Sequence, residues 1–164
     1  MKVVSNASPL INLAAIGKLD LLRRLYRRVT VPTAVWAEVV RRGTGKTGSR
    51  AVRHAPWIRV KAVRDRALVD MLLGELDLGE AESIVLAREL RAHLLLLDDS
   101  RARQSAQRLG LPITGLVGVL IDAAAKGLVS DFAGTLTALR DRAGFWLADD
   151  LVAEALRLHR REVR

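Results

Sequence analysis

The chain has 164 residues, of which 50% are hydrophobic and 4% aromatic, a size and composition that fit one domain with an aliphatic core. It contains no cysteine, which excludes disulfides, thiolate zinc sites and cysteine nucleophiles. The opening residues are too few and too polar for a signal peptide, and Asp122 interrupts the longest apolar run of the C-terminal half. We therefore expect residues 1–164 to form a single cytoplasmic domain without a membrane-spanning segment.

Basic residues outnumber acidic ones, with 27 Lys and Arg against 18 Asp and Glu and a formal net charge of +9. Most of the basic residues are arginines, and they cluster at residues 23–28, 41–66 and 157–164. Clustered positive charge favours a polyanionic partner, above all nucleic acid. The alternative explanation is a GC-rich genome, which raises the arginine and alanine content without a functional cause.

The N-terminal residues 2–5 are expected to form a strand that leads into a helix. Ser8 and Pro9 are typical of the N-cap and the first position of that helix. Asn6 therefore lies at the carboxyl end of the strand, just before the helix. From this stretch alone, a turn residue that bonds to its own backbone is the favoured interpretation of Asn6.

A second strand is expected at residues 29–31, followed by a helix at residues 33–42 whose valines face the core. Glu38 lies in the second turn of this helix. It can pair at helical spacing with one of the two arginines that follow it, an interaction that contributes only a few tenths of a kcal/mol. The sequence around Glu38 by itself therefore predicts nothing beyond a surface ion pair.

Residues 43–49 read G-T-G-K-T-G-S and contain the G-K-T of a phosphate-binding loop. The first glycine of that motif would fall at position 40, which is Val40, and the segment follows a helix, whereas the motif requires a strand. A nucleoside triphosphate site is therefore excluded, and we expect a flexible basic loop. A strand at residues 57–60 and a basic helix at residues 64–73 come next.

The stretch from residue 77 to residue 103 organises the rest of the chain. Asp77 is a good N-cap, and apolar residues recur on one face of the helix that follows it. Leu94–Leu97 form a wholly apolar run, as expected of a strand that is covered on both faces in a parallel sheet. The run stops at Asp98 and Asp99, which therefore lie at the carboxyl end of a strand, where ligands bind in open α/β sheets.

Glu80 lies in the first turn of the helix after Asp77, so its carboxylate can point toward the same sheet edge. Acidic side chains from two separate elements at one edge indicate a divalent-metal site. Each acid also has a simpler interpretation. Glu80 can complete a capping box with Asp77, and Asp99 can be only the N-cap of the helix that starts at Ser100.

The C-terminal part alternates further helices with one short strand. The helices are expected at residues 100–109, 115–126, 131–142 and 149–162, and the strand at residues 112–114. Arg101 and Arg103, in the first of these helices, are either solvated or neutralise the neighbouring acids. Alternation of strands and helices along the whole chain predicts an α/β domain with a parallel sheet.

Four segments together resemble PIN domains. They are V-V-S-N-A-S-P-L-I at the first strand, L-D-L-G-E-A-E-S-I-V-L-A, L-L-L-L-D-D-S-R-A-R, and L-G-L-P-I-T-G. The combination of G-E-A-E with L-D-D-x-x-A-R is similar to one uncharacterised prokaryotic branch of the PIN-like superfamily, which is related to VapC-type toxins. The resemblance covers Val3 to about Leu128.

The resemblance implies a three-layer α/β/α sandwich with a mainly parallel central sheet, and a ribonuclease that depends on Mg²⁺ or Mn²⁺. It also implies RNA as substrate, an antitoxin protein as partner of a toxin, and a homodimer. The metal-binding positions of the family would fall on Asn6, Glu38, Glu80 and Asp98, with Asp99 as the alternative to Asp98. The catalytic residues would be Glu38, Glu80 and Asp98.

One position departs from the family pattern, because the usual aspartate of the first strand is Asn6 here. An asparagine can offer its carbonyl oxygen to Mg²⁺ but removes one negative charge from the cluster. The alternative function is therefore a catalytically weakened PIN-like module that binds RNA or a protein partner. A DNA-binding regulator is less well supported, because the sequence has no helix-turn-helix pattern.

Overall fold

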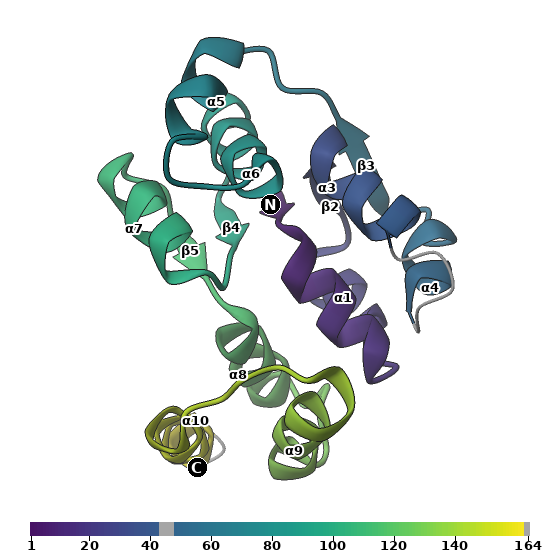
Figure 1. Cartoon of the computed structure of the whole chain (residues 1–164). Coiled ribbons are helices and arrows are strands. Elements are labelled where there is room, and N and C mark those ends of the chain that lie inside the picture. Colours follow the sequence, from purple (N-terminus) through teal and green to yellow (C-terminus); the bar gives the residue numbers. More distant parts are fainter. Residues whose placement is uncertain (43–47, 163–164) are drawn as a thin grey trace.

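The computed structural model describes residues 1–42 and 48–162, so most of the predicted basic loop lies outside the described residues. Five strands form one sheet in the order β3-β2-β1-β4-β5, and all the neighbouring pairs are parallel (Figure 1). The strands are β1 (Val3–Ser5), β2 (Val29–Pro32), β3 (Ile58–Lys61), β4 (Leu94–Leu96) and β5 (Ile113–Thr114). The predicted parallel sheet is confirmed, with each strand at its expected place.

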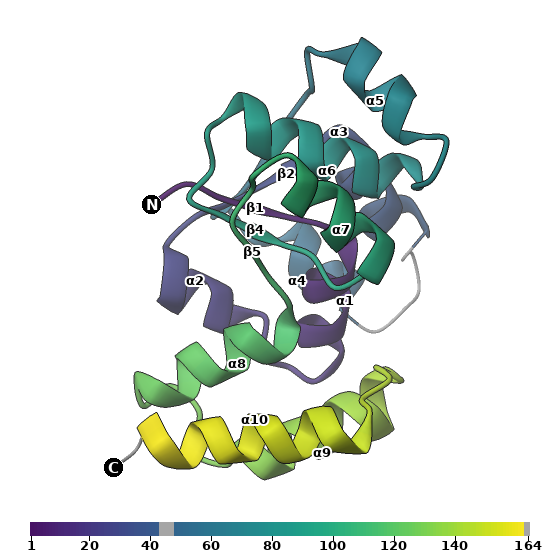
Figure 2. The same cartoon turned by 90° about the vertical axis from the view of Figure 1, so that its left-hand side faces the viewer.

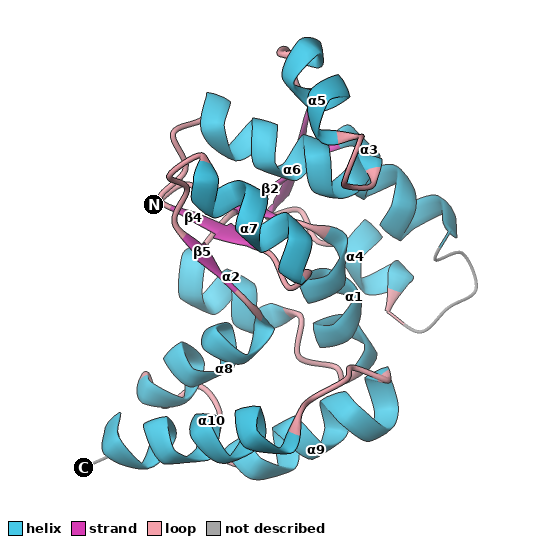
Figure 3. Ribbon diagram, turned by 60° about the vertical axis from the view of Figure 1, so that its left-hand side comes forward, coloured by secondary structure: helices cyan, strands magenta, loops and turns pink. Residues whose placement is uncertain are grey.

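Helices cover both faces of the sheet, as Figures 2 and 3 show. They are α1 (Ala7–Ala15), α2 (Asp20–Tyr26), α3 (Thr33–Ala37), the π-helix η1 (Glu38–Arg42), α4 (Ser49–Arg53), α5 (Arg66–Leu72), α6 (Leu78–Glu89), α7 (Ser100–Arg108), α8 (Leu116–Ala125), α9 (Phe132–Ala143) and α10 (Asp149–Glu162). The arrangement is a three-layer α/β/α sandwich, which confirms the predicted fold class.

Each strand divides its side chains between two cores because successive residues point to opposite faces of a sheet. Val3 and Leu96 are buried with α1, α8 and α9 on one face. Val4, Leu95 and Leu97 are buried with α6 and α7 on the other. The apolar run at 94–97 is therefore buried on both sides, as its composition predicts.

Several helix boundaries differ from the predicted ones, and the short helix α4, which begins inside the expected basic loop, was not predicted. The first helix begins at Ala7 with Asn6 as its N-cap residue, and the prediction of Ser8 as N-cap was wrong. The backbone of Asn6 is extended, so α1 starts directly after the strand, and Pro9 fits because early helical N–H groups have no intrahelical partner. The helix predicted at 33–42 is α3 continued by the π-helix η1, a wider turn that begins at Glu38.

The C-terminal helices α8, α9 and α10 pack against one another beneath the sheet (Figure 2). Asp131 caps α9 by accepting a hydrogen bond from the backbone N–H of Gly134, and Gly144 ends it with a φ of 67°. Both features agree with the predicted helix. Within residues 1–42 and 48–162, no helix is long and apolar enough to cross a membrane.

Candidate active site

Asn6 and Asp98 lie at the same edge of the sheet because they follow neighbouring parallel strands. Ser5 is in register with Leu96, and the backbone N–H of Asn6 donates a hydrogen bond to the carbonyl oxygen of Leu96 at 3.0 Å. Asn6 is buried, and its side chain makes no capping hydrogen bond to the described helix α1. The backbone of Asn6 is therefore held at the sheet edge by its pairing with β4.

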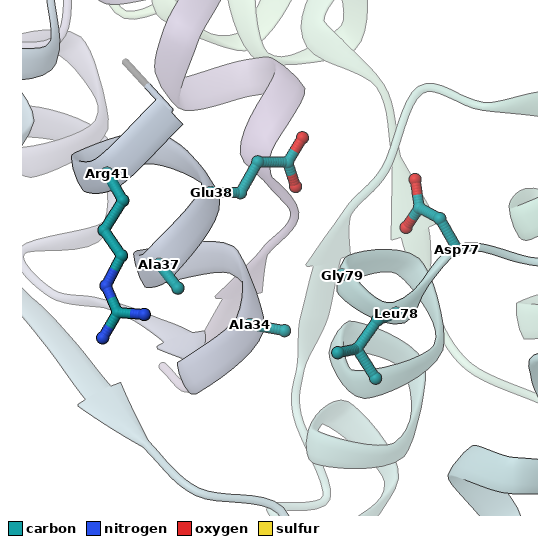
Figure 4. Close-up of a pocket in the computed structure, with 7 residues that line it drawn as sticks. All are labelled: Ala34, Ala37, Glu38, Arg41, Asp77, Leu78 and Gly79. Atoms are coloured by element: carbon teal, nitrogen blue, oxygen red, sulfur yellow. The ribbon is translucent and has the colours of Figure 1, made fainter. Parts of the chain in front are cut away.

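Gly79, in the first turn of α6, lies where the oxygen-bearing side chains of three elements meet. A Cβ built on Gly79 would lie 3.1 Å from Oε2 of Glu38, 3.5 Å from Oδ1 of Asp77 and 3.6 Å from Oδ1 of Asn6. Figure 4 shows Glu38 extending from its helix toward Asp77 at the start of α6. The two acids line a cavity of about 390 Å³ together with Arg41. Two acids and a carboxamide, far apart in the sequence, thus converge beside the N-terminus of a helix.

The wide turn of η1 contributes to this convergence. Glu38 is its first residue and is half-buried, with its carboxylate beside Gly79. Single π-helical turns within helices occur frequently at functional sites. The carboxylate also approaches the N-terminus of α6, where the helix dipole favours negative charge.

Glu80 completes a capping box with Asp77, the simpler of its two sequence interpretations. Its backbone N–H donates to Oδ1 of Asp77 at 2.8 Å, and its Oε2 accepts from the backbone N–H of Asp77 at 3.1 Å. The pKa of Glu80 is nevertheless raised, first by burial and then by the negative charges of Asp77, Asp99 and Glu38, against the lowering effect of the backbone hydrogen bond. Glu80 therefore both caps α6 and belongs to a cluster of mutually repelling acids.

Asp98 and Asp99 have separate surroundings. Oδ1 of Asp98 accepts from the backbone N–H of Leu116 at 2.9 Å, at the start of α8, and Arg103 lies beside it. Burial raises the pKa of Asp98, while the Leu116 hydrogen bond and the charge of Arg103 lower it. Asp99 is exposed and caps α7 by accepting from the backbone N–H of Ala102 at 2.9 Å.

The structure thus brings Asn6, Glu38 and Glu80 together, with Asp99 close enough to affect the pKa of Glu80. Asp98 lies at the same sheet edge but is turned toward α8. In the part of the chain that the structure describes, no three His, Asp or Glu side chains stand at metal-binding separations from one another. The residues predicted to bind the metal therefore lie at one edge of the sheet, but their side chains do not form a complete coordination site among the described residues.

The available side chains fit a hard divalent cation by their chemistry. The donors are carboxylate and carboxamide oxygens, which Mg²⁺ and Mn²⁺ prefer. Oδ2 of Asp98 is buried and, within the described ranges, has no hydrogen-bond partner. The raised pKa of Glu80, caused first by burial and then by the charges of neighbouring acids, indicates negative charge that the surroundings of Glu80 do not neutralise. A cation would compensate both.

Sequence reasoning missed three residues of this region. Asp77 was read only as an N-cap, yet its carboxylate also faces Glu38; Gly79 was given no role, yet its missing side chain leaves room for the carboxylate of Glu38. Glu82 was not singled out, although a glutamate among residues as apolar as Ala81 and Ile84 is a signal of a paired buried charge.

Glu82 joins α6 to α3 and α5. It is 5% exposed; its Oε2 accepts from the backbone N–H of Ala34 at 2.9 Å, and its Oε1 accepts from Nη1 of Arg66 at 2.7 Å. Ala34 lies in the first turn of α3, whose continuation carries Glu38. The buried carboxylate of Glu82 therefore helps to set the position of Glu38 relative to α6.

Replacing Glu82 by Ala should lower the free energy of unfolding by about 2 kcal/mol, because it leaves the half-buried Ala34 N–H without its charged acceptor and removes the partner of Arg66. Urea unfolding followed by circular dichroism measures this difference. Glu75→Ala is the control, because the Glu75–Arg108 pair is exposed and spans 4.0 Å, and it should change stability little. Equal effects of the two substitutions would contradict the structural role of Glu82.

A comparison with known families agrees with the fold. The family model DUF3368, a PIN domain, matches residues 2–161, and no curated protein matches the chain. PIN domains are generally nucleases and typically use divalent metal ions. The match confirms the resemblance of the four sequence segments to PIN domains. The chain belongs to the PIN domain family.

Proposed function

We propose that residues 1–164 form a single PIN domain that acts as a divalent-metal-dependent endoribonuclease. One observation carries the proposal. Oxygen atoms of Asn6, Glu38 and Asp77 surround Gly79 at the carboxyl edge of a parallel sheet, and Glu80 lies in the same helical turn. Ligands of open α/β sheets bind at this edge, and a net charge of +9 favours a polyanionic substrate.

Glu38, Glu80 and Asp98 would hold the metal, with Asn6 as a neutral oxygen donor and Asp99 as the alternative to Asp98. A bound Mg²⁺ or Mn²⁺ supplies Lewis-acid polarisation of a phosphodiester and a water of lowered pKa. The acids themselves repel RNA phosphates, so the substrate must be held by cationic groups. Arg41 lines the same cavity as Glu38 and can pair with a phosphate oxygen through its guanidinium.

The biological setting of the proposal follows from the resemblance to VapC-type toxins. It comprises cytoplasmic RNA cleavage by a toxin, an antitoxin protein that inhibits it, and a homodimer. A second candidate function is a weakened PIN module that binds RNA or a protein without cleavage. The specific observation in its favour is Asn6, which lowers the negative charge of the cluster.

Incubation of the purified protein with mixed cellular RNA, with Mn²⁺ and with EDTA in its place, tests the proposal on a denaturing gel. We expect cleavage in Mn²⁺ and none in EDTA. Cleavage that persists in EDTA would contradict a metal-dependent enzyme. Intact RNA in both samples would favour the binding module.

Gly79→Ala should lower metal-dependent cleavage roughly tenfold without destabilising the protein. The new Cβ would lie 3.1 Å from Oε2 of Glu38 and displace that carboxylate by a few tenths of an ångström, and small displacements at a reacting centre are costly. Alanine also favours a helix over glycine by up to about 1 kcal/mol, so thermal stability should stay equal or rise.

Gly74→Ala is the matched control, because the nearest atom to its new Cβ is the Met71 carbonyl oxygen at an ordinary 3.7 Å. It should leave the cleavage rate unchanged. A Gly79→Ala protein with the parental rate would show that the position of the Glu38 carboxylate does not matter for the reaction.

A further inference from the structure

A second cavity lies beside the acidic edge, between α7, the start of α8 and the segment that joins α9 to α10. Its volume is about 590 Å³, within the range of small-molecule sites. Figure 1 shows α7 above α8, with α10 beside α8. Asp98 and Arg103 line the cavity, so it is adjacent to the sheet edge that carries the candidate active site.

The outer wall of this cavity carries an exposed tryptophan. Trp146 is 81% exposed, although burial of an indole is strongly favourable, and the half-buried Phe145 precedes it in the same wall. Val117 and Ile121 of α8 add aliphatic surface. A flat apolar ligand in this cavity would therefore contact two aromatic side chains and the aliphatic surface of α8.

The part of the lining that α7 contributes is polar. Gln104 and Gln107, three residues apart on α7, are both exposed and both line the cavity. Each primary amide offers donors and an acceptor in one plane, which matches the hydrogen-bonding edges of a nucleobase. Arg103 is anchored by a 3.0 Å hydrogen bond from its Nη1 to the carbonyl oxygen of Leu97, which places a cation between this wall and the acidic edge.

We infer that this cavity is a subsite for one unpaired nucleobase of single-stranded RNA, with Trp146 as the stacking platform and Gln104 and Gln107 as readers of the base edge. Proteins recognise single-stranded RNA by stacking splayed bases on aromatic side chains and by bonding to their edges. A phosphate group alone would not use the aromatic wall, and a base paired within a duplex is already stacked between its neighbours. The inference rests on the proposed function, since the bound base would place the adjoining phosphodiester toward Asp98.

Binding in EDTA separates this subsite from cleavage. The probes are fluorescein-labelled single-stranded RNAs of about 12 nucleotides, a length within the footprint of such sites, and a duplex of equal length. Trp146→Ala should weaken binding of the single strands about tenfold, the size expected for one lost stacking contact, and leave duplex binding unchanged. Trp146→Phe, which keeps an aromatic ring at this position, should bind the single strands almost as tightly as the parent does. Met71→Ala is the control, since Met71 is an equally exposed apolar residue on α5, at 77% exposure.

When the single-stranded probes are the four RNA homopolymers, the double variant Gln104→Ala/Gln107→Ala should change which homopolymer binds most tightly. Trp146→Ala should weaken binding of all four. Unchanged affinity of Trp146→Ala, equal loss on single strands and duplex, or a parent that binds no single-stranded RNA would each overturn the inference. RNA binding through Trp146 without Mn²⁺-dependent cleavage would sink the proposed function and leave the subsite standing. Mn²⁺-dependent cleavage whose KM is the same in Trp146→Ala as in the parent would overturn the subsite and leave the proposed function standing.

Discussion

Glu80→Gln should lower Mn²⁺-dependent RNA cleavage roughly 100-fold, equivalent to about 2.7 kcal/mol of activation free energy. The substitution removes an anionic oxygen ligand but keeps an amide oxygen that can accept the hydrogen bond from the Asp77 N–H. The cap of α6 therefore survives, and the loss can be assigned to charge. Initial cleavage rates on one labelled RNA measure the effect, and Glu75→Gln, the same change at an exposed residue, is the control.

The same substitution should increase stability at neutral pH in the absence of metal. Because the pKa of Glu80 is raised in the folded protein, the folded state binds more protons than the unfolded state just above the ordinary glutamate pKa, and stability falls as the pH rises through that window. Glutamine has no such titration. Urea unfolding in EDTA should show Glu80→Gln above the parent at about pH 7 and close to it at about pH 4.

A gain of stability with a loss of cleavage is the pattern expected of a residue retained for function. Loss of both stability and cleavage would show that the role of Glu80 is the cap alone. Unchanged cleavage would remove Glu80 from the catalytic residues.

Asn6→Asp should raise Mn²⁺-dependent cleavage, by roughly tenfold or more, because it restores a carboxylate where the other acids converge. In EDTA the substitution should destabilise the protein, since Asn6 is buried and the new charge would lie near Glu38 and Asp77. Added Mn²⁺ should then raise the melting temperature of Asn6→Asp more than that of the parent, as expected when a ligand binds only the folded state.

Asn12→Asp is the matched control, because it adds the same charge to the same helix at a half-buried residue whose side chain bonds to Ser8. It should change neither cleavage nor the response to Mn²⁺. An inert parent with an active Asn6→Asp variant would establish the natural chain as a binding module on a nuclease fold. Equal melting-temperature responses of the parent and Asn6→Asp to Mn²⁺ would place the metal away from Asn6.

The fold and the shared sheet edge of the candidate site followed from local patterns. The apolar run Leu94–Leu97 is typical of a strand buried on both faces, and strands alternate with helices along the chain, which predicts a parallel sheet. Parallel strands end at a common edge, which places Asn6 beside the residues after β4. The cap formed by Asp77 and Glu80 is equally local, because it needs only a spacing of three residues.

What the sequence by itself determined was therefore the order of the elements, the parallel sheet and the edge at which acids gather, since these depend on periodicity and chain connection. The tertiary structure alone decided the meeting of Glu38 with Gly79, the turn of Asp98 toward Leu116, and the link from Glu82 to Ala34 and Arg66. These contacts join elements far apart in the chain. Their geometry depends on how helices pack, down to a π-helical turn and a missing Cβ, and no periodic pattern in the sequence records that.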